Sequence, residues 1–252
     1  MPYRVDLRTI GADTLDRLID LGALDVEPLT GSGVAALMPD RVPPAQLARE
    51  LGVEEVRVSP AVGRDADSVW ILHPRPIQVG AATLRMLDSE AFGTGLHPST
   101  TLCLDALRDA VDGTVPDRVL DVGVGSGVLA LAALLLGVPR ATGIDTDGEA
   151  LLVAAGNARL NALDGRLELI RGGPERVAGT WPLVLANVLA APLIEMAPSL
   201  VRRVGHRGQL VLSGIPASVA DDVDRAYRRL GMHHVRSTTR EGWTALVMHA
   251  SW

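Results

Sequence analysis

The sequence predicts a two-part α/β protein, in which a small mixed unit precedes a larger unit built on a mostly parallel sheet. Three observations support this prediction. From about residue 98 onward, short apolar runs alternate with segments of helical periodicity. These runs are apolar throughout, which is typical of strands covered by helices on both faces. The first 61 residues follow a different order, in which two short strands come in succession.

Residues 1–61 are expected to form a β-α-β-β-α-β unit, the ferredoxin-like arrangement. YRVDLR is strand-like, and ADTLDRLIDLGA carries apolar residues at helical spacing. LDVEPLT and GVAALMP are short strands joined by Gly-Ser-Gly, which is a hairpin signal. PPAQLARELG predicts a helix with proline at its entry, and EEVRVSP predicts the last strand. We therefore expect a small domain over 1–61, a linker over 62–90 and the main domain over 91–252.

The main domain begins its regular structure with a helix at Pro98, over PSTTLCLDALRDAV. RVLDVG, ATGIDT, LELIRG, PLVLANV and QLVLSGI then predict five strands. Helical segments alternate with them, and the one before QLVLSGI is APLIEMAPSLVRRV, which ends at Val204. HHVRSTTREGW and TALVMHA close the chain without a helix between them. We therefore expect an antiparallel hairpin added to an otherwise parallel sheet.

Composition excludes several classes of protein. The net charge of −6 provides no basic field for a phosphate backbone, so we expect no direct nucleic-acid binding. A single cysteine excludes a disulfide framework and a multi-cysteine metal site, and no metal site is predicted. The longest apolar stretch, VLALAALLLGV, is too short to span a membrane. MPYRVDLRTIG lacks the pattern of a secretory signal, so the expected location is the cytoplasm.

A glycine-rich turn lies between a predicted strand and a predicted helix in RVLDVGVGSGVLALAALL. Such a turn lets the backbone and the helix N-terminus approach a ligand closely. Its glycines are Gly123, Gly125 and Gly127, whereas the dinucleotide pattern G-x-G-x-x-G needs the third glycine at position 128. This register weighs against a dehydrogenase. Asp121 lies two residues before the first glycine, from where a carboxylate could reach the cation of a zwitterionic ligand.

Asp145 ends the next predicted strand, ATGIDT. An acid at this position can accept hydrogen bonds from both ribose hydroxyls of a nucleoside, although a strand-end Asp can also be only a helix N-cap. The glycine turn about 20 residues upstream favours the ligand interpretation. A nucleoside that carries an amino acid and no diphosphate is S-adenosyl-L-methionine, which we predict as the cofactor.

Three blocks then carry a resemblance to a known family: AFGTGLHPSTTLCLDAL; VLDVGVGSGVLALAALLLG with GIDTDGEAL and NARLNAL; and LVLANVLAAPLIEMAPSL followed by LVLSGI. They resemble the class I S-adenosylmethionine-dependent methyltransferases and, more narrowly, the PrmA-type enzymes that methylate the eleventh protein of the large ribosomal subunit. The resemblance implies a seven-stranded Rossmann-like sheet and a ferredoxin-like N-terminal domain for substrate recognition. It also implies methyl transfer to lysine side chains or to the N-terminal amine of that ribosomal protein, by a monomer.

The resemblance also implies roles for individual residues. In the family, the FGTG-x-HP-x-TT segment covers the cofactor, which makes Phe92 a lid residue, although Phe92 could instead be a hydrophobic plug between the domains. His97 with Pro98 is expected to order the helix start. The predicted cofactor contacts are Phe92, Gly93, Thr94, Thr100, Asp121, Gly123, Gly125, Asp145 and Asn187.

Asn187 is the predicted catalytic residue, and it has a physical case of its own. It follows the apolar strand LVLA and would stand at the carboxyl end of that strand, where ligands of such sheets bind. Its amide oxygen could hold an amine by its hydrogens and aim the lone pair at a methyl group, so that positioning accelerates the transfer. The alternative is that Asn187 only forms a turn at the strand end.

The chain departs from the family pattern in the linker. Only AATLRMLDSE separates RPIQVG from AFGTG, and a PPW segment usual in the family is missing. This favours, as an alternative, the same chemistry on another protein or on a small amine. A non-catalytic module that binds the cofactor is a further alternative.

Overall fold

The computed structural model of the chain describes residues 3–7, 14–23, 25–29, 33–39, 42–53, 56, 58–60, 76–86 and 97–252. Its contacts divide the chain into two units. One unit comprises Met1–Arg75 and Asp88–His97, and the other comprises Pro76–Leu87 and Pro98–Trp252. Each unit is built on its own sheet.

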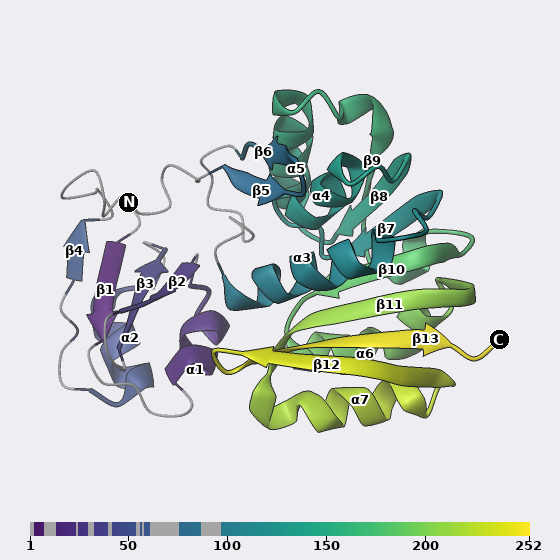
Figure 1. Cartoon of the computed structure of the whole chain (residues 1–252). Coiled ribbons are helices and arrows are strands. Elements are labelled where there is room, and N and C mark those ends of the chain that lie inside the picture. Colours follow the sequence, from purple (N-terminus) through teal and green to yellow (C-terminus); the bar gives the residue numbers. More distant parts are fainter. Residues whose placement is uncertain are drawn as a thin grey trace. The chain divides into compact units, whose positions relative to one another are not determined.

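The first unit has the element order and strand order of the ferredoxin-like arrangement (Figure 1). Its sheet has the order β2-β3-β1-β4, and every neighbouring pair is antiparallel. Leu18 and Leu47 from the two helices and Val5 and Met38 from the strands are buried in its core. Its elements are β1 (Tyr3–Leu7), α1 (Thr14–Asp20), β2 (Asp25–Pro28), β3 (Val34–Met38), α2 (Pro44–Leu51) and β4 (Val58–Pro60).

The second unit contains a seven-stranded sheet with the order β12-β13-β11-β10-β7-β8-β9 (Figure 1). β11, β10, β7, β8 and β9 run parallel, whereas β13 pairs antiparallel with both β11 and β12. This confirms the predicted Rossmann-like sheet with a terminal antiparallel hairpin. The strands are β7 (Arg118–Val122), β8 (Arg140–Asp145), β9 (Leu167–Arg171), β10 (Trp181–Asn187), β11 (Val204–Pro216), β12 (Met232–Arg240) and β13 (Trp243–Ala250).

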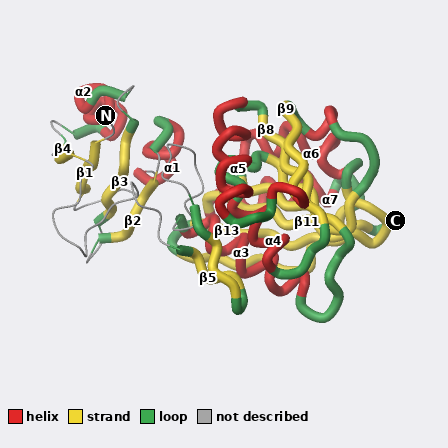
Figure 2. The backbone as a smooth tube through the Cα atoms, turned by 90° about the horizontal axis from the view of Figure 1, so that it is seen from above, coloured by secondary structure: helices red, strands yellow, loops and turns green. Residues whose placement is uncertain are grey.

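Helices cover both faces of this sheet, as Figures 1 and 2 show. Side chains of α3 and α4 pack with Val119 and Leu185 on one face, and side chains of α6 and α7 pack with Leu120 and Val184 on the other. Successive strand residues therefore point to opposite faces and meet different helices. The helices are α3 (Pro98–Val111), α4 (Val128–Leu135), α5 (Gly148–Leu160), α6 (Ala190–Val201) and α7 (Ala220–Arg228), with short 3-10 helices at Asp164–Arg166, Pro174–Arg176 and Ala217–Val219.

Within the predicted linker, the structure describes a short hairpin of β5 (Ile77–Val79) and β6 (Ala82–Leu84), which belongs to the second unit. Leu84 is fully buried in the core that α3 and α4 share. The side chain of Asn161 bonds to both backbone groups of Arg85, accepting its N–H at 2.8 Å and donating to its carbonyl at 2.6 Å. Part of 62–90 thus packs as a structural element, while the domain boundaries themselves stay a prediction.

β11 starts earlier than the pattern QLVLSGI indicates, because VGHRG also lies in the strand. The preceding helix, expected to run to Val204, ends at Val201. Arg207 has a φ of +52°, and its N–H donates to the carbonyl of Trp252 at 2.8 Å. A contact with the far end of the chain, which no local pattern indicates, thus accompanies this extra length of strand.

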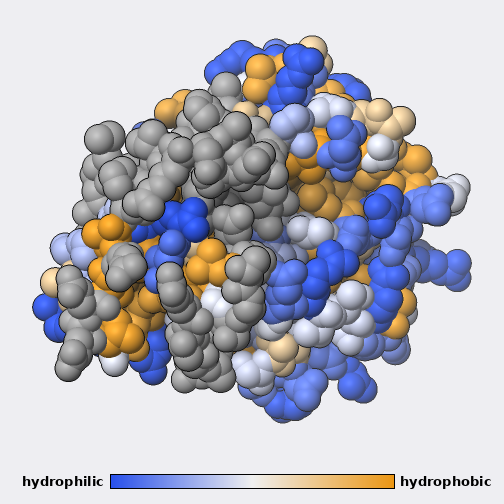
Figure 3. Space-filling model, turned by 60° about the vertical axis from the view of Figure 1, so that its left-hand side comes forward, coloured by the Kyte–Doolittle hydropathy of each residue, from blue (hydrophilic) through white to orange (hydrophobic). Residues whose placement is uncertain are grey.

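No helix within the described ranges is long and apolar enough to cross a membrane. The apolar run VLALAALLLGV forms α4, which has eight residues, of which seven are buried. Its apolar side chains pack in the core between α3 and the sheet. On the face drawn in Figure 3, hydrophilic and hydrophobic residues are interspersed over the described surface.

Candidate active site at the carboxyl ends of β10, β7 and β8

Three neighbouring strands of the second unit end in the segments that the sequence singled out. β10 ends at Asn187, β7 ends at Val122 before the glycine turn, and β8 ends at Asp145. The chain order along the sheet reverses between β7 and β10, because β8 follows β7 on one side and β11 follows β10 on the other. Ligands of open α/β sheets bind at the carboxyl edge beside such a switch point.

The glycine turn is held by backbone bonds to the neighbouring strand. The N–H groups of Gly123 and Val124 both donate to the carbonyl of Ile144, at 2.9 and 3.0 Å. Gly123 has a φ of +71°, and a Cβ at this position would lie 2.4 Å from Cγ1 of Val188. Only glycine fits here without strain or displacement of Val188, because side chains both disfavour this φ and need the occupied space. The turn is therefore fixed close to both β8 and the residue that follows Asn187.

Asp145 binds the turn through its carboxylate. Oδ2 accepts the N–H of Gly125 at 2.9 Å, and Oδ1 accepts the N–H of Asp147 at 3.0 Å. The N-cap of α5 is Asp147 instead, whose side chain accepts the N–H of Glu149. The N-cap alternative for Asp145 is therefore wrong. Each Asp145 oxygen holds one backbone N–H and has capacity for a further hydrogen bond.

Asp121 lies beneath the turn, with only 1% of its surface exposed. Its Oδ2 accepts the N–H of Ala130 in α4 at 3.0 Å, whereas Oδ1 has no partner within the described part of the chain. Burial, reinforced by the charge of Asp145, raises the pKa of Asp121 to about 8 despite the opposing bond from Ala130. Asp121 thus ties the glycine turn to α4, and its direct contact with a ligand stays a prediction.

Asn187, at the end of β10, contacts Thr100 of α3. Nδ2 of Asn187 donates to Oγ1 of Thr100 at 3.3 Å, and the two residues are 87 positions apart in the chain. Thr100 lies fully buried in the first turn of α3. Oδ1 of Asn187 is buried and has no partner among the residues that the structure describes. A side chain that only formed a turn would bond to its own segment, so the contact with α3 favours a role in the site.

Of the predicted site residues, the structure brings together Thr100, Asp121, Gly123, Gly125, Asp145 and Asn187 around these strand ends. Phe92, Gly93 and Thr94 lie outside the described residues, so their roles stay predictions. α3 begins at Pro98, directly after His97, as predicted.

The family model described as "Ribosomal protein L11 methyltransferase (PrmA)" matches residues 69–251. The chain belongs to this family.

Relatives and a solved structure agree with this assignment. The chain is 44% identical over 186 residues to a ribosomal protein L11 methyltransferase of Chromohalobacter salexigens, an alignment that covers 72% of this chain and 60% of the relative. It is 36% identical over 229 residues to one of Geobacter sulfurreducens, covering 88% and 75%. The crystal structure of a ribosomal protein L11 methylase from Lactobacillus delbrueckii subsp. bulgaricus superposes with a TM-score of 0.62 at 27% identity, covering 69% of this chain and 88% of that one.

Sequence reasoning missed two supports of the site in this PrmA-family chain. Nδ2 of Asn157 donates to the carbonyl of Ser126 at 2.8 Å, so α5 holds the glycine turn from a buried position. Val188 fills the space above Gly123. Both residues stand in segments that carry the resemblance, NARLNAL and LVLANVLA, but neither pattern indicates which partner the side chain meets.

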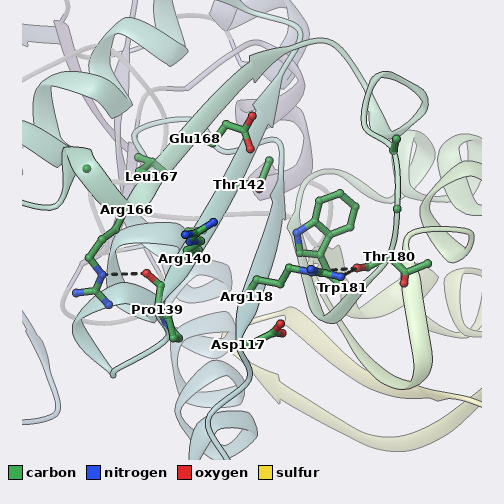
Figure 4. Close-up of a pocket in the computed structure, with 14 residues that line it drawn as sticks. Asp117, Arg118, Pro139, Arg140, Thr142, Arg166, Leu167, Glu168, Thr180 and Trp181 are labelled. Carbon is green, nitrogen blue, oxygen red and sulfur yellow. Dashed lines mark hydrogen bonds between the residues drawn. The ribbon is translucent and has the colours of Figure 1, made fainter.

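A separate hollow of about 740 Å³ lies at the opposite, amino-terminal edge of the PrmA-family sheet (Figure 4). Arg118 donates twice to the carbonyl of Thr180, and Arg166 donates to the carbonyls of Leu134, Val138 and Pro139. These bonds give both guanidinium groups a structural role, because they satisfy carbonyls at the end of α4, before β8 and before β10. None of the predicted site residues lines this hollow.

Proposed function

We propose that the chain is a protein N-methyltransferase, which transfers methyl groups from S-adenosylmethionine to amines of a large-subunit ribosomal protein. The acceptors are lysine side chains, the N-terminal amine, or both. The observation that carries the proposal is that Oδ1 of Asn187, beside the glycine turn, is buried and has no hydrogen-bond partner among the described residues. Membership of the PrmA family supports this chemistry and this acceptor.

The residues around the glycine turn fit S-adenosylmethionine. The Asp145 carboxylate, held by two backbone N–H groups, would accept the ribose hydroxyls. The positive φ of Gly123 and Gly125 lets the backbone come close to the amino-acid part of the cofactor. Thr100 would contact the cofactor from α3, while Phe92, Gly93 and Thr94 would cover it. When bound, S-adenosylmethionine would supply an electrophilic methyl group, whose bond to the sulfonium sulfur breaks as the amine attacks, and S-adenosylhomocysteine would leave.

Asn187 would hold the acceptor amine. Its Oδ1 accepts an N–H of the amine, and the bond from Nδ2 to Thr100 keeps the side chain in one orientation. The nitrogen lone pair is then aimed in line with the methyl group, so positioning provides the rate enhancement. An amine is nucleophilic only when neutral. The Asp145 carboxylate is bonded to two backbone N–H groups, and the Asp121 carboxyl group is buried beneath the glycine turn, so we assign the lost proton to water.

We also propose a binding partner and a cellular location for the chain. The first unit, with its ferredoxin-like order, would recognise the ribosomal protein. The net charge of −6 supports an enzyme that contacts the protein and not the ribosomal RNA. We propose that it acts as a monomer in the cytoplasm.

The test uses methyl-labelled S-adenosylmethionine and large ribosomal subunits from cells that lack this gene. The purified chain is compared with Asn187→Ala, and binding of S-adenosylhomocysteine to each is measured by calorimetry. We expect label on the eleventh large-subunit protein with the wild type, and a loss of at least about a hundredfold in rate with Asn187→Ala.

Other outcomes separate the alternatives. Absence of ribosomal label with intact binding of S-adenosylhomocysteine would move the acceptor to another protein or a small amine, which the short linker also favours. A chain that binds the cofactor but labels no acceptor from a cell extract would be a non-catalytic module. Failure to bind the cofactor would refute the proposal entirely.

A further inference from the structure

Ser213 lies next to Asn187 in the sheet and contacts the helix that carries Thr100. Asn187 of β10 and Ser213 of β11 are register partners. The Ser213 side chain is completely buried, and its Oγ donates to the carbonyl of Ser99 at 2.8 Å, across 114 positions of the chain. Ser99 directly precedes Thr100 in the first turn of α3.

This hydrogen bond is additional to those of the helix itself. A carbonyl in the first turn of a helix already accepts the N–H four residues later. The Ser213 hydroxyl therefore does not complete the helix, and it instead docks the start of α3 on the end of β11. A hydroxyl buried beside the strand end forms the bond in a place where water cannot compete for it.

The backbone of β11 is shaped for this contact. The register of β11 with β13 shifts between Leu212 and Ile215, so Ser213 and Gly214 leave the regular ladder. Such irregularities re-aim a side chain and are frequent beside active sites. Gly214 has a φ of +79°, and a Cβ there would lie 2.5 Å from the carbonyl oxygen of Val188. Gly214 thus packs directly on the backbone of Val188, the residue that follows Asn187.

These contacts form a closed circuit of three elements. β10 pairs with β11, Ser213 of β11 holds α3 at Ser99, and Thr100 of α3 meets Nδ2 of Asn187 on β10. We propose that Ser213 is a positioning residue for the Asn187 amide, which acts through the first turn of α3. The inference rests on the proposed catalytic role of Asn187 and adds the residue that keeps its amide aimed at the acceptor.

The main variant is Ser213→Ala in the full chain, with Ser213→Thr to restore the hydroxyl. Ser199→Ala is the matched control, because Oγ of Ser199 also donates to a carbonyl at 2.8 Å, that of Met196 within α6, and takes no part in the contacts between β10, β11 and α3. We expect Ser213→Ala to lower kcat roughly tenfold while KM for the ribosomal protein changes less than about twofold, because aim is lost and binding is kept. Ser213→Thr is expected to recover most of kcat, and Ser199→Ala to retain the wild-type value.

A second readout does not depend on turnover. Hydrogen–deuterium exchange of the peptide covering the first turn of α3 should quicken in Ser213→Ala and stay unchanged in Ser199→Ala. Ser213→Cys, which replaces the hydroxyl by a weaker donor, should lower kcat less than Ser213→Ala does, and it keeps the test possible if Ser213→Ala does not fold. Wild-type kcat and unchanged exchange in Ser213→Ala would overturn the inference. If the wild type methylates no ribosomal protein, the proposed function fails, whereas the exchange comparison still decides whether Ser213 holds α3.

Discussion

The N–H of Gly125 donates to Oδ2 of Asp145 at 2.9 Å, so the acid that ends β8 holds the glycine turn that follows β7. The two features that the sequence coupled only by their spacing are therefore bonded to each other. This bond fixes both the turn and the carboxylate in place. The expected consequence is a cofactor site whose acceptor oxygens are set before the ligand arrives, which lowers the cost of binding.

Asp145→Asn is expected to weaken binding of S-adenosylhomocysteine by about 10- to 100-fold, because hydrogen bonds to a charged group contribute roughly 1.5–3 kcal/mol. Calorimetric titration measures the effect. Asp147→Asn is the control, since Asn caps a helix as well as Asp does and Asp147 lies two residues away. Equal losses in both variants would contradict a specific role for Asp145.

Gly123→Ala should destabilise the fold more than Gly113→Ala. Both glycines have positive φ, +71° and +89°, but a Cβ on Gly113 meets nothing within 4 Å, whereas one on Gly123 lies 2.4 Å from Cγ1 of Val188. Gly113→Ala is expected to cost about 1 kcal/mol from φ alone, and Gly123→Ala about 1–3 kcal/mol more from overpacking.

Urea unfolding of both variants measures this difference. The double variant Gly123→Ala/Val188→Ala should recover part of the steric cost, because it removes the atom that the new Cβ meets. Purely additive losses in the double variant would show that Val188 does not limit the space at Gly123.

The raised pKa of Asp121 makes the stability of the cofactor-free protein depend on pH. The pKa rises from 3.8 to about 8, mainly through burial. Between these values the folded protein keeps a proton that the unfolded chain has released, so the free energy of unfolding falls as pH rises through this window. Asp121→Asn removes this titration and can still accept the N–H of Ala130.

We therefore expect the wild type to lose on the order of a few kcal/mol more than Asp121→Asn between pH 5 and pH 8. Urea unfolding at the two pH values gives both numbers. Identical pH dependence in the two proteins would mean that Asp121 is ionised in the folded state throughout the range.

Asn157→Ala should make the glycine turn more mobile, because it removes the support from α5. The variant removes the donor to the Ser126 carbonyl, and an unsatisfied buried polar group costs about 1–3 kcal/mol. Hydrogen–deuterium exchange should quicken in the turn and not in the β5–β6 hairpin. Asn161→Ala, which releases Arg85 beside that hairpin, should show the reverse pattern. The same exchange pattern in both variants would contradict two separate supports.

Much of the site could be predicted from local sequence patterns, because its residues lie in short segments at the ends of strands. Period and apolar runs place the strands, so Asn187 and Asp145 fall at carboxyl ends and the glycines fall between a strand and a helix. The prediction for Asp121 was less complete. Its position before the turn is right, but strand residues alternate between faces, and Asp121 points into the covered face towards α4. The pKa of Asp121 depends on its burial, and the burial of a single residue cannot be read from the sequence.

The sequence by itself determined the order of the elements, the glycine turn, the acid of β8 and the family. Only the tertiary structure decided that Thr100 meets Asn187 across 87 positions and that Ser213 meets Ser99 across 114. Helical and strand periodicity depend on residues that are close together in the chain, so both can be recognised in the sequence. A hydrogen bond between distant segments depends on how the sheet and helices pack, and a Ser or Thr that makes one has the same local pattern as one that does not.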